Sequence, residues 1–309
     1  MKTTIPITLI ILIIPNDTFE TMAKNQLSPE IDSFIKRQLA DWPLAGVNYV
    51  NLVKIERKPF SAGALKGFVQ YNPGRIASNT AKVDAGSVSE RKCFLCDENR
   101  PSQQESLNII PGWKILLNPF PILENHLTIS SESHIPQQLH PEAAVQLTKH
   151  LPGMIVFYND DGAGASAPDH RHFQAVTFGE LPLVNFVDKN FGNPYLLNEL
   201  PFLIRTGEIS DSLSADDELE KRILKEKPLN AFFWNTSAGR IRYIFIPRKA
   251  HRPDYFYLEP PLRRSFSPGA LDMAGILVTP FREDFNAVTD IEIQEIYEQV
   301  AFKPSSHEG

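Results

Sequence analysis

The chain has 309 residues, of which 42% are hydrophobic and 22% are charged, and its formal net charge is −6. These values are ordinary for a folded protein and exclude a disordered chain, and the length suits one large domain or two smaller ones. The negative charge argues against a general nucleic-acid binder, which needs a basic surface, but allows a local basic pocket for a small phosphorylated ligand.

An apolar run at residues 4–15 follows Lys2 at the start of the chain. It is shorter than the about 20 residues that cross a bilayer, so it fits a membrane anchor less well than a signal-peptide core or a stretch ahead of a translation start at Met22. The last alternative is favoured, with residues 1–22 as a leader or an incorrect start. Two cysteines, Cys93 and Cys96, favour a reducing compartment or a metal site over a disulfide scaffold. We therefore expect a cytoplasmic protein with no membrane partner.

Apolar spacing and turn residues predict the elements that follow. Ser28 caps a helix over 28–42, in which Pro29 occupies the first turn. The other expected elements are strands at 47–53, 68–71, 113–117 and 127–129, a helix at 141–151, strands at 154–158 and 170–174, strands at 231–235 and 240–246, and a helix at 291–300. Helices and strands mixed in this way predict the α+β class.

Two segments, 126–134 and 242–251, share a short strand followed by a polar turn that ends in histidine. This weak repeat predicts two related α+β halves, which we place at 23–181 and 182–309. A strongly charged stretch at about 206–228 predicts an insertion in the second half.

A group of polar residues follows the Gly- and Ala-rich loop after the strand at 154–158. In a strand, residues two apart point to the same face, so His170, His172 and Gln174 are expected to project together beside a loop whose glycines let backbone amides approach an anion. A neutral imidazole can attack phosphorus and split a transfer into two easier steps. The alternative is a pair of hydrogen-bonded or solvated histidines without a catalytic role.

The segment from Asn159 to Gln174 resembles the active-site segment of the histidine-triad superfamily, in its His-x-His-x-Gln branch. That branch includes galactose-1-phosphate uridylyltransferase, diadenosine tetraphosphate phosphorylase and GDP-L-galactose phosphorylase. Further similar motifs, in the family's order, are Cys93-Phe-Leu-Cys96 with Asn99-Arg100, Asn118-Pro-Phe120, the strand that ends in Asn159, and the stretches 260–265 and 267–275. The resemblance spans roughly Phe68 to Val300. It implies two histidine-triad-like halves with antiparallel sheets and flanking helices.

The resemblance also implies a role for each matching residue. His172 is the nucleophile, and Gln174 stands where the hydrolytic branch has a third histidine and binds phosphoryl oxygens. The residues implied to bind substrate are Asn159, Gly162, Gly164, Ser166, Arg75, Asn118 and Phe120, and Arg263 is our further candidate for an anion site. The loop is one residue longer between Ser166 and His170 than the usual family spacing, which puts the role of Ser166 in doubt.

A zinc site is implied by the same resemblance, with ligands Cys93, Cys96, His134 and His170. His126 is a rival for the third ligand position, and the alternative to a metal is a pair of buried, reduced cysteines. A second, late metal site of the uridylyltransferases needs a His-x-His pair that is missing from 252–259, so we expect that site to be absent.

The resulting hypothesis is a phosphorylase-type nucleotidyltransferase with a nucleotidyl-His172 intermediate. Its donor is a nucleotide sugar or a dinucleoside polyphosphate, and its acceptor is inorganic phosphate. The alternatives are exchange with a hexose 1-phosphate, hydrolysis of a dinucleoside polyphosphate, and nucleotide binding without catalysis. The base, the sugar and the oligomeric state stay open, a homodimer being one alternative.

Overall fold

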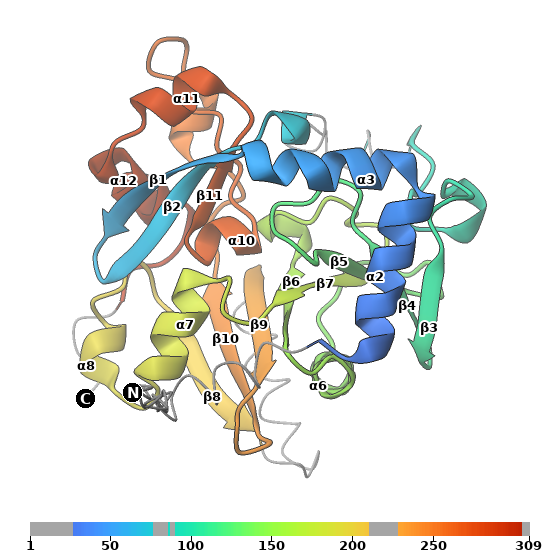
Figure 1. Cartoon of the computed structure of the whole chain (residues 1–309). Helices are drawn as coiled ribbons and strands as arrows, with labels where there is room; N and C mark the ends of the chain where they lie inside the picture. The colour runs from blue at the N-terminus through green and yellow to red at the C-terminus, as the bar shows by residue number, and fades with distance from the viewer. Residues whose placement is uncertain (1–26, 77–85, 87–89, 210–227, 305–309) are drawn as a thin grey trace, which may run out of the picture.

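The computed structural model describes residues 27–76, 86, 90–209 and 228–304, which form two sheets flanked by helices (Figure 1). The large sheet has eight strands in the order β3-β4-β5-β7-β6-β9-β10-β8, and every pair of neighbours in it is antiparallel. The small sheet has the order β1-β2-β11, in which β11 runs parallel to β2. The predicted α+β class with antiparallel sheets is therefore confirmed, with this one parallel pair as an addition.

The strands are β1 (Glu56–Ala62), β2 (Leu65–Tyr71), β3 (Ser106–Ile110), β4 (Trp113–Leu117), β5 (Leu127–Ser131), β6 (Met154–Asn159), β7 (His172–Thr177), β8 (Arg205–Ile209), β9 (Leu229–Asn235), β10 (Ile241–Pro247) and β11 (Ile276–Thr279). The helices are α2 (Pro29–Asp41), α3 (Pro43–Val50), α6 (Pro141–His150), α7 (Pro182–Lys189), α8 (Pro194–Leu197), α10 (Ala270–Met273), α11 (Arg282–Ala287) and α12 (Asp290–Val300). Short 3-10 turns follow several of these elements.

Strands from before and after residue 181 share both sheets. β6 pairs with β9 at the middle of the large sheet, where Val156 lies opposite Phe233. β2 pairs with β11, where Phe68 lies opposite Ile276. The division into halves at 23–181 and 182–309 stays a prediction. Residues 206–209 of the predicted insertion lie in β8, while 210–227 and the leader at 1–22 lie outside the described residues.

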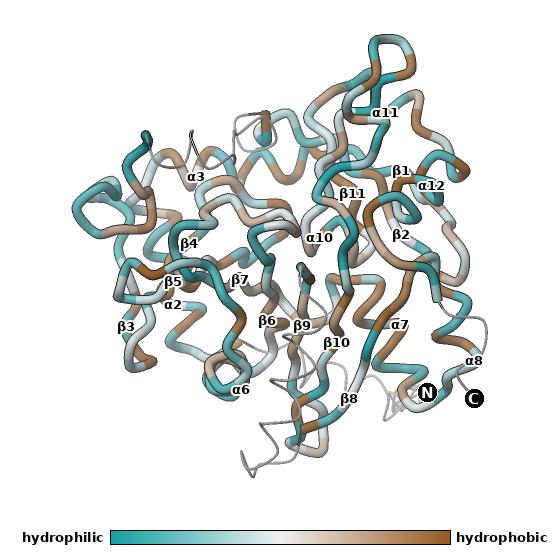
Figure 2. Tube along the Cα trace, turned by 180° about the vertical axis from the view of Figure 1, so that it is seen from behind, coloured by the Kyte–Doolittle hydropathy of each residue, from teal (hydrophilic) through white to brown (hydrophobic). Residues whose placement is uncertain are grey.

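The central strands of the large sheet are buried on both faces, and their side chains alternate between two hydrophobic cores. In β6, Val156 and Tyr158 pack in the core under α2, α3 and α6, whereas Ile155 and Phe157 pack in the core shared with α7, α10, α12 and the small sheet. α10 contacts β6, β9 and β11, and both views place it between the two sheets (Figure 2). Strands covered on both faces have continuous apolar runs, as β6 does.

The first helix was predicted correctly, and the element after it was not. Ser28 caps α2 by accepting a hydrogen bond from the backbone N–H of Ile31 at 3.3 Å, and a proline occupies the first turn. Residues 47–53, predicted as a strand, belong to α3 and a 3-10 turn at Asn51–Lys54. The prediction relied on the β propensity of valine, but Val47, Val50 and Val53 recur every third residue and all are exposed, which matches a helical repeat.

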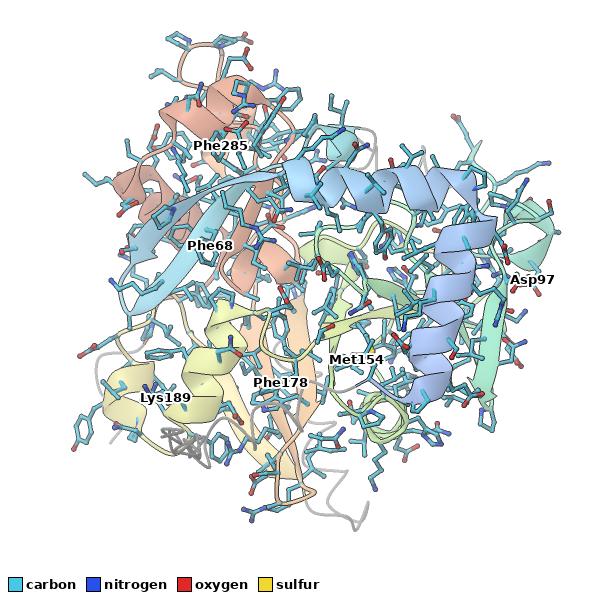
Figure 3. The ribbon with its side chains drawn as sticks, in the orientation of Figure 1. Phe68, Asp97, Met154, Phe178, Lys189 and Phe285 are labelled. Carbon is cyan, nitrogen blue, oxygen red and sulfur yellow. The ribbon has the colours of Figure 1, made fainter. Side chains whose placement is uncertain are left out.

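Phe68 and Phe285 mark the small-sheet end of the molecule, and Asp97, beside the two cysteines, marks the opposite edge (Figure 3). The candidate catalytic residues lie between these ends, on β7 and the loop after β6. Among the described residues, no helix has both the length and the apolar character that crossing a bilayer requires.

Arg248 is a buried cation that joins the end of β10 to its neighbours. It is 2% exposed, and it donates hydrogen bonds to Asn230 Oδ1 at 2.6 Å, to the Val300 carbonyl at 3.1 Å and to the Ala250 carbonyl at 3.0 Å. Burial lowers the pKa of Arg248 to about 10, so its guanidinium stays charged at neutral pH. Asn230 in turn donates to Asn159, which carries this network to the loop after β6.

Replacing Arg248 with methionine should lower the free energy of unfolding by about 2–4 kcal/mol, because the buried carbonyls of Val300 and Ala250 and the Asn230 amide oxygen would lose their donors. Urea unfolding followed by circular dichroism measures the change. The control is Arg240→Met, which removes an exposed guanidinium from Glu208 while Arg242 still pairs with that carboxylate, and it should cost below about 1 kcal/mol. Equal losses in both variants would contradict the structural role of Arg248.

Candidate active site and metal-binding cluster

A cavity of about 810 Å³ lies between β5, β7 and β6 of the large sheet and the segment 251–272. This volume is in the range that holds a nucleotide-sized ligand. Its apolar and aromatic lining residues are Trp42, Leu44, Phe94, Leu95, Pro101, Pro119, Phe120, Ile122, Phe157, Ala165, Ala270, Leu271 and Val278. Its polar lining residues are Arg75, Arg91, Gln104, Asn118, Thr128, Asn159, Ser166, His172, Gln174, His251, Arg252, Ser267 and Asp272.

The sheet register brings side chains of three neighbouring strands to one wall of the cavity. Gln174 of β7 lies opposite Thr128 of β5 on one side and opposite Phe157 of β6 on the other. His172 and Gln174 are two apart in β7 and both line the cavity, as the strand period predicts. His170 does not share their face, because β7 begins only at His172 and the histidine ring turns toward the cysteines.

His172 is held on three sides and keeps one nitrogen toward the cavity. Its Nδ1–H donates to the carbonyl of His170 at 2.8 Å. Gln137 accepts from the His172 backbone N–H at 2.8 Å and donates to its carbonyl at 3.0 Å. No described residue forms a hydrogen bond with Nε2. Burial lowers the pKa of His172 to about 4, so the ring is neutral at pH 7 and Nε2 carries a lone pair.

His126 orients the Gln174 amide from behind the cavity wall. His126 is 1% exposed, its Nδ1 accepts from the Ile122 backbone N–H at 3.3 Å, and its Nε2 lies 2.8 Å from Gln174 Oε1. Because Nδ1 accepts, the ring proton must be on Nε2, where it donates to Oε1. Gln174 therefore presents its NH₂ group as the donor. His126, a rival zinc ligand in the sequence prediction, lies outside the metal-binding cluster.

Asn159 ties the loop after β6 to the opposite wall. Its Oδ1 accepts from Asn230 at 2.8 Å and from the backbone N–H of Ala270 at 2.7 Å, and its carbonyl accepts from Gln137 at 2.8 Å. Gly164 has φ +95°, and a Cβ at this position would lie 2.7 Å from the Cα of Gly269. Only glycine fits this close approach of two loops.

Most of the predicted substrate-binding residues line the same cavity. These are Arg75, Asn118, Phe120, Asn159, Gly164 and Ser166. Gly162 and Arg263 are not among its lining residues. Gly162 faces Pro228, and Arg263 is exposed with its guanidinium 5.8 Å from the Phe256 ring.

Residues that sequence reasoning did not place at the site are Gln137, Asn230, His251, Arg252 and Ser267. Ser267 begins the stretch 267–275 that carries part of the family resemblance, but no residue of that stretch was predicted to bind substrate, and the other four belong to no short motif with its own chemical signature. The one signal in the sequence that could have indicated Arg252 is its position in a cluster of basic residues after β10.

Three arginines, Arg75, Arg91 and Arg252, give the cavity its positive charge. Arg75 donates to the Phe120 carbonyl at 2.7 Å, and burial lowers its pKa to about 10, which leaves it charged. Arg91 pairs with Asp169 at 2.9 Å and also donates to the Ser166 carbonyl at 3.2 Å. Burial raises the pKa of the Asp272 carboxyl to about 6, although hydrogen bonds from Val278 and Gly269 and the nearby arginines oppose the shift. The balance favours an anionic ligand.

Beside the cavity, Cys93, Cys96, His134 and His170 form a cluster whose ligand atoms all lie within 4.8 Å of one another. The Nδ1 of His170 is 3.3 Å from Cys93 Sγ and 3.6 Å from Cys96 Sγ, and the Nδ1 of His134 is 3.1 Å from Cys96 Sγ. The bond lengths of a tetrahedral zinc site place its ligand atoms about 3.3–3.8 Å apart, and these three distances of 3.1–3.6 Å are of that order.

The tautomer of His170 also suits a metal. Its Nε2 lies 2.9 Å from the carbonyl of Ser131, which can only accept, so the ring proton is on Nε2 and Nδ1 faces the sulfurs. A metal-ligating histidine commonly donates its other N–H to a backbone carbonyl in this way. The four residues therefore form a group that could hold a metal ion.

The pattern of a family described as a domain of unknown function (DUF4922) matches residues 34–177. No curated protein sequence matches the chain.

Three solved structures of the yeast Ap4A phosphorylase Apa2 share the fold. The complex with AMP has a TM-score of 0.60 and 16% identity, covering 92% of this chain and 100% of the other. The structure of Apa2 itself has a TM-score of 0.56 and 15% identity, and the complex with Ap4A has 0.55 and 14%; each covers 85% of this chain and 98% of the other. At these identities the similarity establishes the fold.

The protein should lose stability between pH 7.5 and pH 5 because of His126. Burial, together with the charge of Arg75, lowers the pKa of His126 to about 3, against about 6.5 in the unfolded chain. Both states are neutral above pH 6.5. Below it the unfolded state gains a proton that the folded state does not, so acidification favours unfolding by up to about 2 kcal/mol at pH 5.

Urea unfolding at both pH values measures this loss for the wild type, for His126→Gln and for the exposed control His150→Gln. The His126→Gln variant should show a smaller loss than the other two. The same loss in all three proteins would be inconsistent with a neutral, buried His126.

Proposed function

We propose that this protein is a phosphorylase-type nucleotidyltransferase of the His-x-His-x-Gln branch, which works through a nucleotidyl-His172 intermediate. The observation that carries the proposal is the state of His172: a neutral ring whose Nδ1–H is fixed on a carbonyl and whose Nε2 lone pair lines a nucleotide-sized, cationic cavity. A histidine that served the fold alone would have both nitrogens paired or facing the apolar core. The donor is a dinucleoside polyphosphate or a nucleoside diphosphate sugar.

The reaction takes place in two displacements. His172 Nε2 attacks the phosphorus next to the nucleoside, so an N–P bond forms while the phosphoanhydride P–O bond breaks and its electron pair leaves with the distal phosphate. Inorganic phosphate then attacks the same phosphorus, which breaks the N–P bond and releases a nucleoside diphosphate. The His172 ring is cationic in the intermediate, and the His170 carbonyl at 2.8 Å stabilises that charge through Nδ1–H.

The other predicted residues bind and orient the substrate. The Gln174 NH₂ group, directed by His126, donates to a phosphoryl oxygen of the group in transfer. Asn159, Gly164 and Ser166 form the loop beside the phosphates, and Arg75 supplies positive charge. Asn118 shapes the turn before Phe120 by accepting from its backbone N–H at 2.9 Å, and the apolar lining nearby suits a base.

Two lines of support bear on the choice of donor and acceptor. The yeast enzyme of the same fold is named an Ap4A phosphorylase and has structures with AMP and Ap4A, which supports a dinucleoside polyphosphate as donor. Gln174 at the place of a third histidine argues against water as the acceptor. A donor panel with and without phosphate separates the alternatives: exchange only with hexose 1-phosphate favours the uridylyltransferase activity, and phosphate-independent release favours a hydrolase.

We further propose that the cluster of Cys93, Cys96, His134 and His170 binds zinc as a structural ion. Two sulfur and two nitrogen donors are a ligand set that zinc prefers, and all four ligand atoms lie within 4.8 Å of one another. His170 links this ion to the reaction, since its ring faces the cysteines and its carbonyl holds His172. The ion would fix the segment that precedes the nucleophile.

His172→Gly and His172→Asn should lower turnover by about 10³-fold or more, since the residue forms the covalent intermediate. Incubation with labelled donor should give an acid-labile, base-stable adduct on the wild type and none on either variant. His150→Asn, which changes an exposed histidine on α6, should keep both turnover and adduct. A His172 variant that keeps more than a few per cent of turnover would exclude the covalent mechanism.

The purified protein should contain about one zinc ion per chain. Cys93→Ser should lose the metal and lower the melting temperature, because metal binding is coupled to folding. His134 is about half exposed, so His134→Ala tests the same ligand set with little change to the core, and His150→Ala is its control. Elemental analysis and thermal unfolding give the result. Metal-free wild-type protein with unchanged stability would favour the reduced-thiol alternative.

A further inference from the structure

One wall of the cavity is formed by the segment after β10 and the loop before α10, and it carries polar residues that have no role in the proposed reaction. His251, Arg252 and Ser267 all line the cavity that contains His172. They come from the segment after β10 and from the loop before α10. This wall lies next to the loop after β6, because the backbone N–H of Ala270 donates to Asn159 Oδ1 at 2.7 Å.

Arg252 is held in one orientation by two contacts. Its Nε donates to Ser267 Oγ at 3.0 Å, and its guanidinium carbon lies 4.2 Å from the centre of the Phe256 ring. These contacts use the Nε and one flat face of the group. In the described part of the chain, no residue accepts a hydrogen bond from Nη1 or Nη2, so both ends of the guanidinium fork remain for a ligand.

The Ser267 hydroxyl has a defined polarity. Its oxygen accepts from Arg252 and also lies 3.1 Å from His251 Nε2. Burial, with the charges of Arg252 and Arg248, lowers the pKa of His251 to about 4, so the ring is neutral and Nε2 can accept the hydroxyl proton. The hydroxyl thus points its lone pairs at Arg252 and its proton at His251. Because the hydroxyl proton is already donated to His251, the hydroxyl serves to orient Arg252.

Arg252 differs in this respect from the other cations of the cavity. Arg91 pairs through Nη2 with Asp169, and Arg75 donates through Nη1 to the Phe120 carbonyl, so at least one end of each of these forks is engaged within the protein. Arginine's planar fork matches two oxygens of a phosphate, and an arginine that is already fixed loses little side-chain entropy when it binds. The arrangement on this wall is therefore suited to a phosphate group.

We propose that Arg252, oriented by Ser267 and Phe256, holds the phosphate on the far side of the bond that His172 attacks. This inference rests on the proposed function. Arg252 binds the distal phosphate of the donor as that phosphate leaves, and it binds the inorganic phosphate that replaces it in the second displacement. Arg263 is exposed, lies 5.8 Å from the same Phe256 ring and does not line the cavity, so the anion site that we predicted for it is assigned to Arg252.

Binding experiments that need no turnover test this assignment. Inorganic tripolyphosphate, and separately AMP and GMP, are titrated calorimetrically into the full-length wild type and Arg252→Gln. The Kd for tripolyphosphate should rise about tenfold or more in the variant, because charge-assisted bonds to phosphate are lost. The Kd for the nucleotide that binds should change less than about twofold. Melting temperatures verify that each variant is folded.

Three further variants sharpen the result. Lys249 lies three residues before Arg252, is exposed and does not line the cavity. Lys249→Gln removes a charge of the same sign, and tripolyphosphate affinity should stay unchanged. Ser267→Ala should weaken tripolyphosphate binding by a few-fold, which is less than the loss of Arg252 itself. Arg252→Lys should not restore affinity, because an ammonium lacks the planar fork.

Either of two results would overturn the assignment. One is equal tripolyphosphate affinity in the wild type and Arg252→Gln, including no binding to either. The other is an equal loss of nucleotide affinity, which would place Arg252 at the nucleotide's own phosphate. Failure of the His172 adduct with an intact effect of Arg252 on tripolyphosphate would refute the covalent mechanism and leave the anion site standing.

Discussion

The hydrogen bonds of Gln137 hold the candidate nucleophile and the loop after β6 together. One side chain bonds both the N–H and the carbonyl of His172 and also the carbonyl of Asn159. From Asn159 the network continues through Asn230 to buried Arg248. The active-site geometry therefore depends on a chain of buried amides and one buried cation that spans β7, β6, β9 and β10. A loss at any link leaves polar groups without water to replace the missing partner.

The site separates two tasks that are both given to histidine. His170 turns its ring toward the two cysteines, while its carbonyl fixes the ring of His172 in the tautomer that the proposed attack requires. His126, from β5's edge, fixes Gln174 in the same manner. Burial keeps His126 and His172 neutral, so the positive charge that meets the ligand comes from arginines. A neutral nucleophile beside fixed cations is suited to attack on an anionic phosphate.

Local sequence patterns predicted the parts of the fold that they determine directly. The strand at 113–117, the buried strand that became β6 and the capped helix α2 follow from apolar runs and a serine cap. Motif similarity placed His172, Gln174 and the four clustered metal-ligand candidates, because spacing within a motif survives when the rest of a sequence changes. The strand predicted at 47–53 was wrong, since propensity alone does not decide a half-exposed segment.

Other features depend on contacts between distant parts of the chain. Gln137 and Asn230 have ordinary sequence surroundings, and only the folded sheet brings them to the nucleophile's strand and loop. Arg252 is one of several basic residues after β10 in the sequence. Only its hydrogen bond to Ser267 in the folded protein distinguishes it from the others. Pairing of β2 with β11 likewise has no signal in a single sequence.

That pairing has a consequence for the order in which the protein folds as it is synthesised. Phe68 and Ile276 are partners although roughly 200 residues separate them. The strands from β3 to β7 meet within a short stretch and can assemble early, whereas the small sheet must wait for the last part of the chain. Until then, Phe157 and its neighbours on one face of the large sheet lack their cover. A ribosome-bound intermediate would thus expose an apolar surface that a chaperone could recognise.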